Sequence, residues 1–461
     1  MGRVKKQLSF FLMVLLAVSL AACGGSAQEG GVQESKVDEE GNVHISISTW
    51  GLPDELAVFN ELVDNFENDN PNIKVNVIHI PDDYSGKMNT MLAGGTAPDV
   101  VFTSDGDFGG WVKAGLFLNI QDMVEESSIN LEDMWESALS RYRWDGRVLG
   151  EGDLYALPKD IGPSALFYNK DLFDEAGVSY PDPEVPMSWD ELLEKAKALT
   201  IDENGNGRPD QFGLGPIWWE GFIWSNGGDI LSEDRTTFVM NEPEAVEALQ
   251  FVADLTHVHK VAPDSRSLEA MDADQMFETG RIAMMTAGRW MVPTYRKLDF
   301  DWDVAPPPAG ATGVSSSWSG SVGYAINKDT NFPEEAFQLI EYLAGERGQE
   351  IQTELGFAIP TYKSVSETDV FLQLGEKPEN AEAFIIGAET QRPGPWTLTP
   401  NNRWLDHVNQ NLTYLWNGER SAEEILDEIA DEVQQLLEEG NPEIFGNEPA
   451  SEEEGEGDGE E

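Results

Sequence analysis

The chain has 461 residues, and its 85 Asp and Glu against 29 Lys and Arg give a formal net charge of −56. This length is typical of about two or three domains of ~150 residues, and a hydrophobic content of 40% can build a folded core. A negative charge of this size repels phosphate groups, so the composition argues against nucleic acid as a partner.

The amino terminus has the pattern of an export signal. Basic residues near the start precede an apolar run over 8–22, which is shorter than the ~20 residues that span a bilayer. The run ends in Leu20-Ala21-Ala22-Cys23-Gly24, which resembles the lipobox of bacterial lipoproteins, where the Cys carries the lipids. We predict a lipoprotein signal peptide over 1–22 and lipidation of Cys23; the alternative is a plain secretory signal with an incidental Cys.

Two further terminal segments have the composition of unfolded chain. Residues 23–42 are rich in Gly, Ser, Gln and Glu and are predicted to form a flexible tether. Residues 447–461 combine many acids with Gly and Ser, and are predicted to form an acidic disordered tail. Cys23 is the only Cys, which excludes disulfides and Cys-based zinc sites.

Between these segments, strands and helices alternate. Apolar residues at every second position predict a strand over 43–47, and apolar residues at three- and four-residue steps predict a helix from Pro53 to a stop at Asn70-Pro71. The same patterns predict a strand over 73–77, a helix over 84–93, a strand over 99–102 and helices over 189–199, 243–255, 333–344 and 422–437. This order indicates an α/β fold with parallel strands.

Several segments resemble one known family. They are Ala97-Pro98-Asp99-Val100-Val101-Phe102 with Phe108-Gly109-Gly110-Trp111, Tyr155-Ala156-Leu157-Pro158 with Phe167-Tyr168-Asn169-Lys170, Pro186-Met187-Ser188-Trp189-Asp190-Glu191, Gly280-Arg281-Ile282-Ala283-Met284 with Gly288-Arg289-Trp290, and residues 320–327 and 356–360. In this order they resemble the extracellular solute-binding proteins of carbohydrate ABC importers, the group that includes maltose-binding protein. The resemblance covers about 43–445.

The resemblance implies a two-lobe periplasmic-binding-protein-like fold, in which each lobe is a mostly parallel sheet flanked by helices and a hinge of crossing segments joins them. It places lobe 1 at 43–160 plus 305–358 and lobe 2 at 161–304 plus 359–446. The three crossings are expected near 159–161, 304–308 and 357–362. Prolines at 158, 306–308 and 360 agree with these positions, although ordinary loops also contain proline.

A sugar-binding cleft is expected to combine aromatic faces with Asp, Asn and Arg, because a sugar ring presents apolar C–H patches flanked by hydroxyls. The chain has 14 Trp, several of them in segments rich in turn residues. The candidate ligand residues are Trp50, Asp105, Asp107, Asp160, Trp218, Trp219, Trp224, Trp290, Trp318, Gly320, Arg392, Trp396 and Trp404. Trp290 matches the stacking aromatic of the family best. The alternative for each Trp is a packing role in the core.

One segment matches the start of a calcium-binding loop. Asp202, Asn204, Asn206 and Asp210 stand at positions one, three, five and nine, and Gly207 stands at position six. The twelfth position is Gly213 instead of the bidentate Glu. The sequence therefore leaves two alternatives, a structural calcium site or a metal-free run of Asx turns; no other cofactor is expected.

These features predict a binding protein, not an enzyme. It would be anchored by lipid alone at the extracytoplasmic face of the cell membrane, act as a monomer, and deliver a sugar, in particular an oligosaccharide, to the permease subunits of an ABC importer. Two alternatives remain, a secreted carbohydrate-active enzyme with paired carboxylates and a binder of a phosphorylated polyol such as glycerol phosphate. The second would need a basic cluster, for which Arg281, Arg289 and Arg392 are the candidates.

Overall fold

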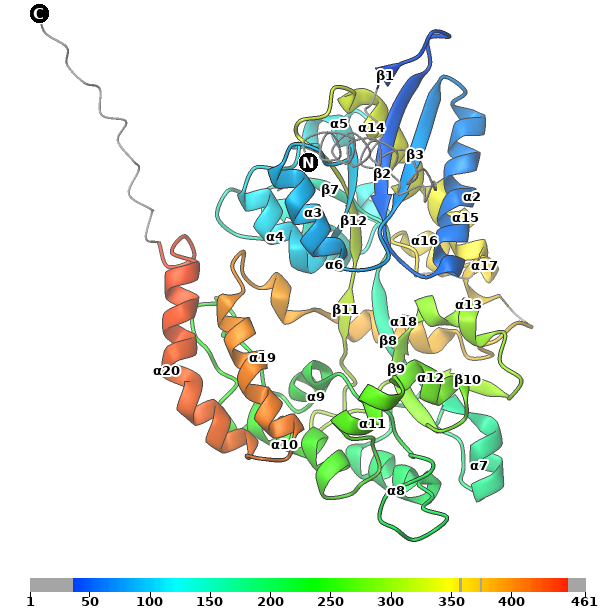
Figure 1. The fold of residues 1–461 in the computed structure, drawn as a ribbon, viewed down its shortest axis with the longest axis vertical. Helices are drawn as coiled ribbons and strands as arrows, with labels where there is room; N and C mark the ends of the chain where they lie inside the picture. The colour runs from blue at the N-terminus through cyan, green and yellow to red at the C-terminus, as the bar shows by residue number, and fades with distance from the viewer. Residues whose placement is uncertain (1–35, 356–358, 374, 447–461) are drawn as a thin grey trace, which may run out of the picture.

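The computed structural model describes residues 36–355, 359–373 and 375–446, so the predicted signal peptide, Cys23 and the acidic tail lie outside the described residues. The chain forms two lobes, the upper and lower halves of Figure 1, each with a β-sheet and flanking helices. The two-lobed α/β architecture is therefore confirmed. None of the helices in the described ranges combines the length and apolar character that a membrane crossing requires.

Lobe 1 contains the amino-terminal elements and several that return from lobe 2. Its elements are β1 (Lys36–Val37), β2 (Val43–Thr49), α2 (Pro53–Asp69), β3 (Ile73–His79), α3 (Tyr84–Ala93), β4 (Val100–Ser104), α4 (Asp105–Lys113), α5 (Gln121–Glu125), η1 (Leu131–Asp133), α6 (Glu136–Leu139), η2 (Ser140–Tyr142), β5 (Arg143–Trp144), β6 (Asp153–Leu154), β7 (Ala156–Pro158), β12 (Val322–Ile326), α14 (Pro333–Ala344), α15 (Glu346–Glu354) and α16 (Lys363–Ser366). In its sheet β4 lies between β2 and β12, β3 pairs with β2, and β7 pairs with β12.

Lobe 2 follows the same plan with a second sheet. Its elements are β8 (Gly162–Asn169), α7 (Lys170–Ala176), α8 (Trp189–Leu199), α9 (Trp219–Ser225), α10 (Pro243–His257), α11 (Ser265–Ala270), α12 (Ala273–Glu278), β9 (Met284–Gly288), η3 (Arg289–Met291), α13 (Val292–Tyr295), β10 (Trp302–Ala305), β11 (Trp318–Gly320), α18 (Glu382–Thr390), β13 (Arg392–Pro393), η4 (Pro395–Thr397), α19 (Arg403–Trp416) and α20 (Ala422–Gly440). The sheet order is β10-β8-β11-β13, with β9 also paired to β8.

Alternation along β8 places the core of lobe 2 on both faces of its sheet. Leu166 and Tyr168 belong to one buried hydrophobic cluster, whereas Ala165 and Phe167 belong to another. Successive side chains of a strand point to opposite faces, so a strand covered on both sides is apolar throughout. Every residue of β8 is buried.

The predicted helix starts are confirmed by their caps. Ser188 Oγ accepts from Glu191 N at 3.3 Å, and the Glu191 carboxylate accepts from Ser188 N at 2.9 Å, which is the reciprocal capping box expected from the sequence. Ser421 and Glu424 form the same arrangement at the start of α20. In α2 the apolar stripe that includes Phe59 and Phe66 faces the lobe 1 core.

The sheets are more antiparallel than the resemblance implied. In lobe 1, β2 is parallel to β3 and β4, but β12 is antiparallel to β4 and β7. In lobe 2, β8 is antiparallel to β9, β10 and β11. In each lobe the strand that enters from the other lobe, β12 in lobe 1 and β8 in lobe 2, is antiparallel to the strands it pairs with.

The crossings between the lobes require a correction. The first lies at 159–161, between β7 and β8, where it was predicted. The second lies at Ser321, between β11 and β12, so residues 305–320 belong to lobe 2. The prolines at 306–308 follow β10, the edge strand of the lobe 2 sheet, and they end that strand because proline cannot donate to a ladder.

The third passage also lies later than predicted. Ile359 pairs with Ile161 beside the first crossing, but Tyr362 and Val365 still pack in the core of lobe 1. The chain reaches lobe 2 by Phe371 in α17 (Asp369–Leu372), which packs in a lobe 2 cluster. The predicted boundary at 358 therefore moves past α16.

The tether is shorter than predicted. Residues 36–42 form β1 and a turn, in which Asp38 accepts hydrogen bonds from Asn42 N and Glu40 N, each at 2.9 Å. Lys36 pairs with His44 across the β1–β2 hairpin. The folded body therefore begins by Lys36.

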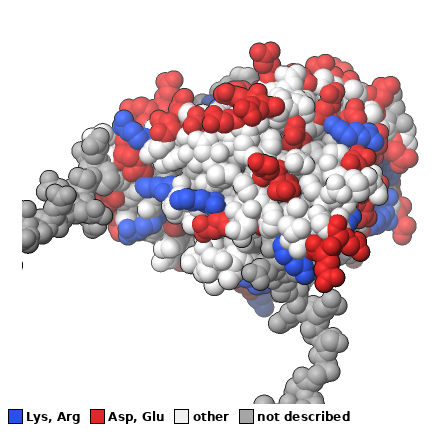
Figure 2. Space-filling model, turned by 90° about the horizontal axis from the view of Figure 1, so that it is seen from above, with Lys and Arg blue, Asp and Glu red and all other residues white. Residues whose placement is uncertain are grey.

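Acidic side chains are spread over the face of the body seen from above. In the view from above, Asp and Glu lie across the upper part and along the rim of this face, with few Lys and Arg between them (Figure 2).

Candidate ligand-binding site

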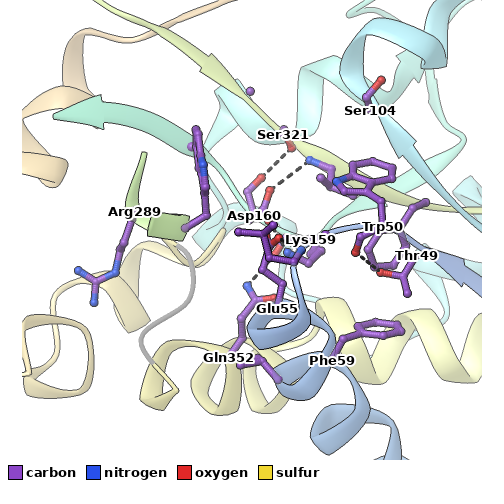
Figure 3. A pocket seen from close by; sticks show the side chains of 18 of the residues that line it. Thr49, Trp50, Glu55, Phe59, Ser104, Lys159, Asp160, Arg289, Ser321 and Gln352 are labelled. Carbon is purple, nitrogen blue, oxygen red and sulfur yellow. Dashed lines mark hydrogen bonds and ion pairs between the residues drawn. The ribbon is translucent and has the colours of Figure 1, made fainter. Parts of the chain in front are cut away.

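A cavity of about 1010 Å³ lies between the two lobes. Lobe 1 contributes the end of β2 and the start of α2, the crossing segments form the floor, and lobe 2 contributes η3, β11 and η4. Figure 3 shows the labelled side chains of Trp50, Glu55, Lys159 and Asp160 around it. Its volume is at the upper end of the range of about 300–1,000 Å³ for small-molecule sites. The predicted ligand residues that line it are Trp50, Asp105, Asp160, Trp290, Trp318, Gly320 and Trp396.

Trp50 forms an aromatic wall on the lobe 1 side. Its ring is held edge to face by Tyr84, at 4.7 Å between centroids, and by Phe102, at 5.4 Å. Gly51 has a φ of +109°, which lets the chain turn directly after the strand, and the Glu55 carboxylate accepts from Leu52 N at 2.5 Å. Burial raises the pKa of Glu55 above its ordinary value.

Trp290, Trp318 and Trp396 form an aromatic wall on the lobe 2 side, and Trp218, which does not line the cavity itself, packs between the first two. Trp218 stacks on Trp290, with 6.2 Å between centroids and planes 20° apart, and lies 4.4 Å from Trp318. Trp318 in turn meets the edge of Trp396 at 5.1 Å. The ring of Trp290 crosses over Gly288, where a Cβ would lie 1.9 Å from the indole. Gly288 is therefore required for the position of this ring.

The floor of the cavity is a hydrogen-bonded group at the crossings. Asp160 Oδ1 accepts from Val322 N at 3.1 Å, and Asp160 Oδ2 pairs with Lys159 Nζ at 2.5 Å. Gln349 and Gln352 donate their side-chain amides to the Lys159 carbonyl at 2.7 and 3.2 Å. Asp160 thus ties the first crossing to the second, in addition to facing the cavity.

Asp105 lies beside the cavity in a buried ion pair. Its side chain is 3% exposed, and its Oδ2 lies 2.5 Å from Nη1 of Arg141, whose side chain is 1% exposed. Burial raises the pKa of the Asp105 carboxyl, and the Arg141 charge opposes that rise. Trp396 Nε1 donates to Asp105 Oδ1 at 2.8 Å. The carboxylate is therefore held by both lobes.

Arg289 lines the cavity but directs its guanidinium elsewhere. In Figure 3 the guanidinium points away from Asp160 and the other labelled side chains. It lies 4.1 Å from the centroid of Phe371 and donates to the Phe371 carbonyl at 2.8 Å. Burial lowers the pKa of Arg289 to about 9. This cation fastens the third passage of the chain to η3, next to Trp290.

Three predicted tryptophans lie away from the cavity wall. Trp404 is 0% exposed and donates its indole N–H to Thr399 Oγ1 at 2.8 Å, so it is a core residue and is removed from the candidate site. Trp219 lines a separate, smaller cavity of lobe 2 together with Trp416. Trp224 is buried and donates to Asp229 at 3.2 Å.

The remaining predicted polar residues also have other partners. Arg392 is exposed, pairs with Asp229 at 2.8 Å and lies over the ring of Trp224. Asp107 accepts from the hydroxyls of Ser85 and Ser104, each at 2.7 Å, at the start of α4. Neither residue lines the cavity.

The loop from Asp202 to Asp210 uses its carboxylates on its own backbone. Asp202 accepts from Gly207 N at 2.7 Å and from Asn206 N at 3.2 Å, and Asp210 accepts from Glu203 N at 3.1 Å. A Cβ at Gly213, the twelfth position, would lie 1.9 Å from a backbone oxygen. The described residues contain no group of three or more His, Cys, Asp and Glu that could hold a metal. Calcium stays a prediction from the sequence.

Chelation tests the calcium prediction. If the loop binds calcium in the folded state alone, an excess of EDTA is expected to lower the melting temperature by a few degrees, and added calcium to restore it. The control is Asp202→Asn, for which EDTA is expected to cause no shift. An unchanged melting temperature of the wild-type protein would contradict calcium binding.

The sequence did not single out several residues of the cavity. Gln352 and Glu55 carry no local signal, because they bind backbone atoms, and the neighbouring Lys159 and Asp160 look like any adjacent pair of opposite charges. Arg141 pairs with Asp105, which is 36 positions away, and donates to Ser319 in β11, which is 178 positions away. The sequence did contain a signal for the turn that follows Trp50. Gly51 comes directly after it, and a glycine at the end of a strand permits the sharp turn found there.

The comparisons with known proteins agree with this geometry. The family model for bacterial extracellular solute-binding proteins matches residues 50–350. A putative binding protein of Brucella abortus is 26% identical, in a match that covers 68% of this chain and 75% of that protein. The galactooligosaccharide-binding protein of Bacillus subtilis is 23% identical, in a match that covers 94% of this chain and 97% of that protein.

A solved structure extends the likeness to three dimensions. An ABC substrate-binding protein of Listeria monocytogenes, in complex with cycloalternan, has a TM-score of 0.76 at 26% identity. The match covers 86% of this chain and 98% of that chain, and so includes both lobes.

Proposed function

The chain belongs to the bacterial extracellular solute-binding protein family, and we propose that it captures an oligosaccharide between its lobes and delivers it to the permease of an ABC importer. The observation that carries the proposal is the pair of tryptophan walls, Trp50 on lobe 1 and Trp290, Trp318 and Trp396 on lobe 2. Aromatic faces cover the C–H patches of sugar rings, and the carboxylates and amides between them accept from hydroxyls. The galactooligosaccharide- and cycloalternan-binding relatives support this ligand class.

The charges around the cavity favour a neutral sugar over a phosphorylated polyol. The acids that line it are Glu55, Asp82, Asp105, Asp160 and Asp274, whereas the cations are Lys159 and Arg289. Lys159 pairs with Asp160, and Arg289 is engaged with Phe371. A phosphate would meet several carboxylates at this lining, and like charges at close range repel.

The transport role follows from hinge bending. A ligand held by both walls binds the closed form better than the open form, and this difference in affinity shifts the population toward the closed form. We propose that the permease binds the closed form. We further propose that the protein acts as a monomer, anchored through lipid on Cys23 at the extracytoplasmic face of the cell membrane.

A thermal-shift screen tests the ligand class. Neutral oligosaccharides are expected to raise the melting temperature in a concentration-dependent way, because they bind the folded state alone. Glycerol phosphate at the same concentration is expected to give no shift. A shift with glycerol phosphate and none with any neutral sugar would favour the phosphorylated-polyol alternative.

Trp290→Ala is expected to weaken binding of the sugar found in that screen by roughly 30-fold, or about 2 kcal/mol, since a central aromatic contact is removed. Calorimetric titration measures this change. The matched control is Trp416→Ala, which removes an indole outside the cavity and is expected to leave affinity unchanged. Equal affinities for Trp290→Ala and wild type would show that the ligand does not use this wall.

A further inference from the structure

Asp105 is buried between protein donors of both lobes. It opens α4 in lobe 1, and as a whole residue it is 4% exposed. Its Oδ2 accepts from Arg141 of lobe 1, and its Oδ1 accepts from the indole N–H of Trp396 in η4 of lobe 2. Since each carboxylate oxygen already accepts from the protein, this side chain is poorly placed to accept from ligand hydroxyls.

Arg141 holds this carboxylate and also reaches lobe 2. Its guanidinium donates to the backbone carbonyl of Ser319 in β11, and to Ser319 Oγ at 2.7 Å. Arg141 is 5% exposed and is absent from the cavity lining. An ion pair whose members are buried and hydrogen-bonded in this way has a defined geometry, so it positions whatever else it binds.

Trp396 joins the ion pair to the ligand cavity. Its ring lines the cavity and meets Trp318 at the end of the lobe 2 wall, while its N–H is bonded to lobe 1. The approach is close, because a Cβ at Gly106 in α4 would lie 2.9 Å from the indole. One residue therefore presents its ring to the cavity and its N–H to the opposite lobe.

We propose that Asp105, held by Arg141, is a positioning residue that binds Trp396 when the lobes close, instead of the ligand contact expected from the sequence. The proposal rests on the proposed function for the role of the cavity, but the Asp105–Trp396 bond needs no ligand to form. When the lobes open, η4 leaves α4 and water solvates both groups. On closure they form one charge-assisted hydrogen bond, which stabilises the closed form and orients Trp396 toward the sugar.

The test measures the balance of open and closed forms in ligand-free protein. Because Cys23 is the only cysteine, a Cys23→Ser protein with Asn60→Cys in α2 and Glu269→Cys in α11 accepts a donor and an acceptor dye at these two exposed positions. Energy transfer between the lobes then gives the ratio of closed to open molecules. Trp396→Phe keeps an aromatic face at the cavity but loses the N–H that binds Asp105.

The matched control is Trp318→Phe, which makes the same exchange in the same wall at a residue with no hydrogen bond to lobe 1 among the described residues. Trp396→Phe is expected to lower the closed-to-open ratio about tenfold relative to this control, the size of effect expected for a hydrogen bond to a charged group. Equal ratios for the two variants would overturn the proposal, as would a wild-type protein with no closed form in the absence of ligand. If no sugar binds, the proposed function is contradicted. The energy-transfer measurement still tests the Asp105–Trp396 bond, because it is made on ligand-free protein.

Discussion

Arg141→Met is expected to lower the free energy of unfolding by about 3–5 kcal/mol, because it leaves the Asp105 carboxylate buried without its counter-charge. Both side chains are almost completely excluded from solvent, at 1% and 3% exposure. The variant also removes two hydrogen bonds to Ser319 in β11. Urea unfolding of wild type and variant measures the difference.

Two further variants separate the ion pair from ordinary packing. Arg143→Met removes a half-buried arginine that donates to the Gly152 carbonyl at 2.9 Å, and it is expected to cost less than about 1 kcal/mol. The double variant Asp105→Leu/Arg141→Met removes both charges and is expected to be more stable than Arg141→Met alone. A loss below about 1 kcal/mol for Arg141→Met would contradict the role assigned to the pair.

Glu220→Gln is expected to stabilise the protein at pH 8 by about 3 kcal/mol and to leave its stability nearly unchanged at pH 4.5. Glu220 lies in the first turn of α9 and is 7% exposed, and none of the basic residues that the structure describes forms an ion pair with it. Burial raises its pKa from 4.5 to about 7. Because the pKa is raised in the folded state, the contribution of the protonated Glu220 carboxyl to the stability of the fold is complete below pH 4.5. That contribution is lost as the pH rises through about 7.

Unfolding by urea at both pH values tests this expectation. The matched control is Glu244→Gln, the same change at an exposed position in the first turn of α10, for which little difference between the two pH values is expected. If the free energies of unfolding of Glu220→Gln and wild type differed by the same amount at pH 4.5 and pH 8, the conclusion that burial raises the pKa of Glu220 would be wrong.

Elements with a local pattern were predictable, and the passages between lobes were not. The helix that starts at Pro53 and those that start at Ser188 and Ser421 follow from apolar spacing and capping residues, which are signals within a few residues of one another. The prolines at 306–308 were ambiguous, because proline marks both hinges and strand ends. β11 has only three residues and thus no periodicity that could place it in lobe 2.

In the candidate site, too, residues with a local sequence signal were predictable and contacts between distant residues were not. Trp290 was predictable because Gly288, two residues before it, lets the ring cross the backbone. Asp105 was placed correctly at the cavity, but its partners Arg141 and Trp396 are 36 and 291 positions away, so its engagement by both lobes had no sequence signal. Trp404 carried a signal that favoured packing, since it begins an apolar stripe in α19 that includes Val408.

The most direct test of the proposed function is a calorimetric titration with neutral oligosaccharides, followed by chromatography of the recovered ligand. The proposed function predicts saturable binding of one sugar molecule per chain and recovery of that sugar unchanged after prolonged incubation. Shortened or otherwise altered sugar in the recovered ligand would contradict it and would favour the carbohydrate-active enzyme.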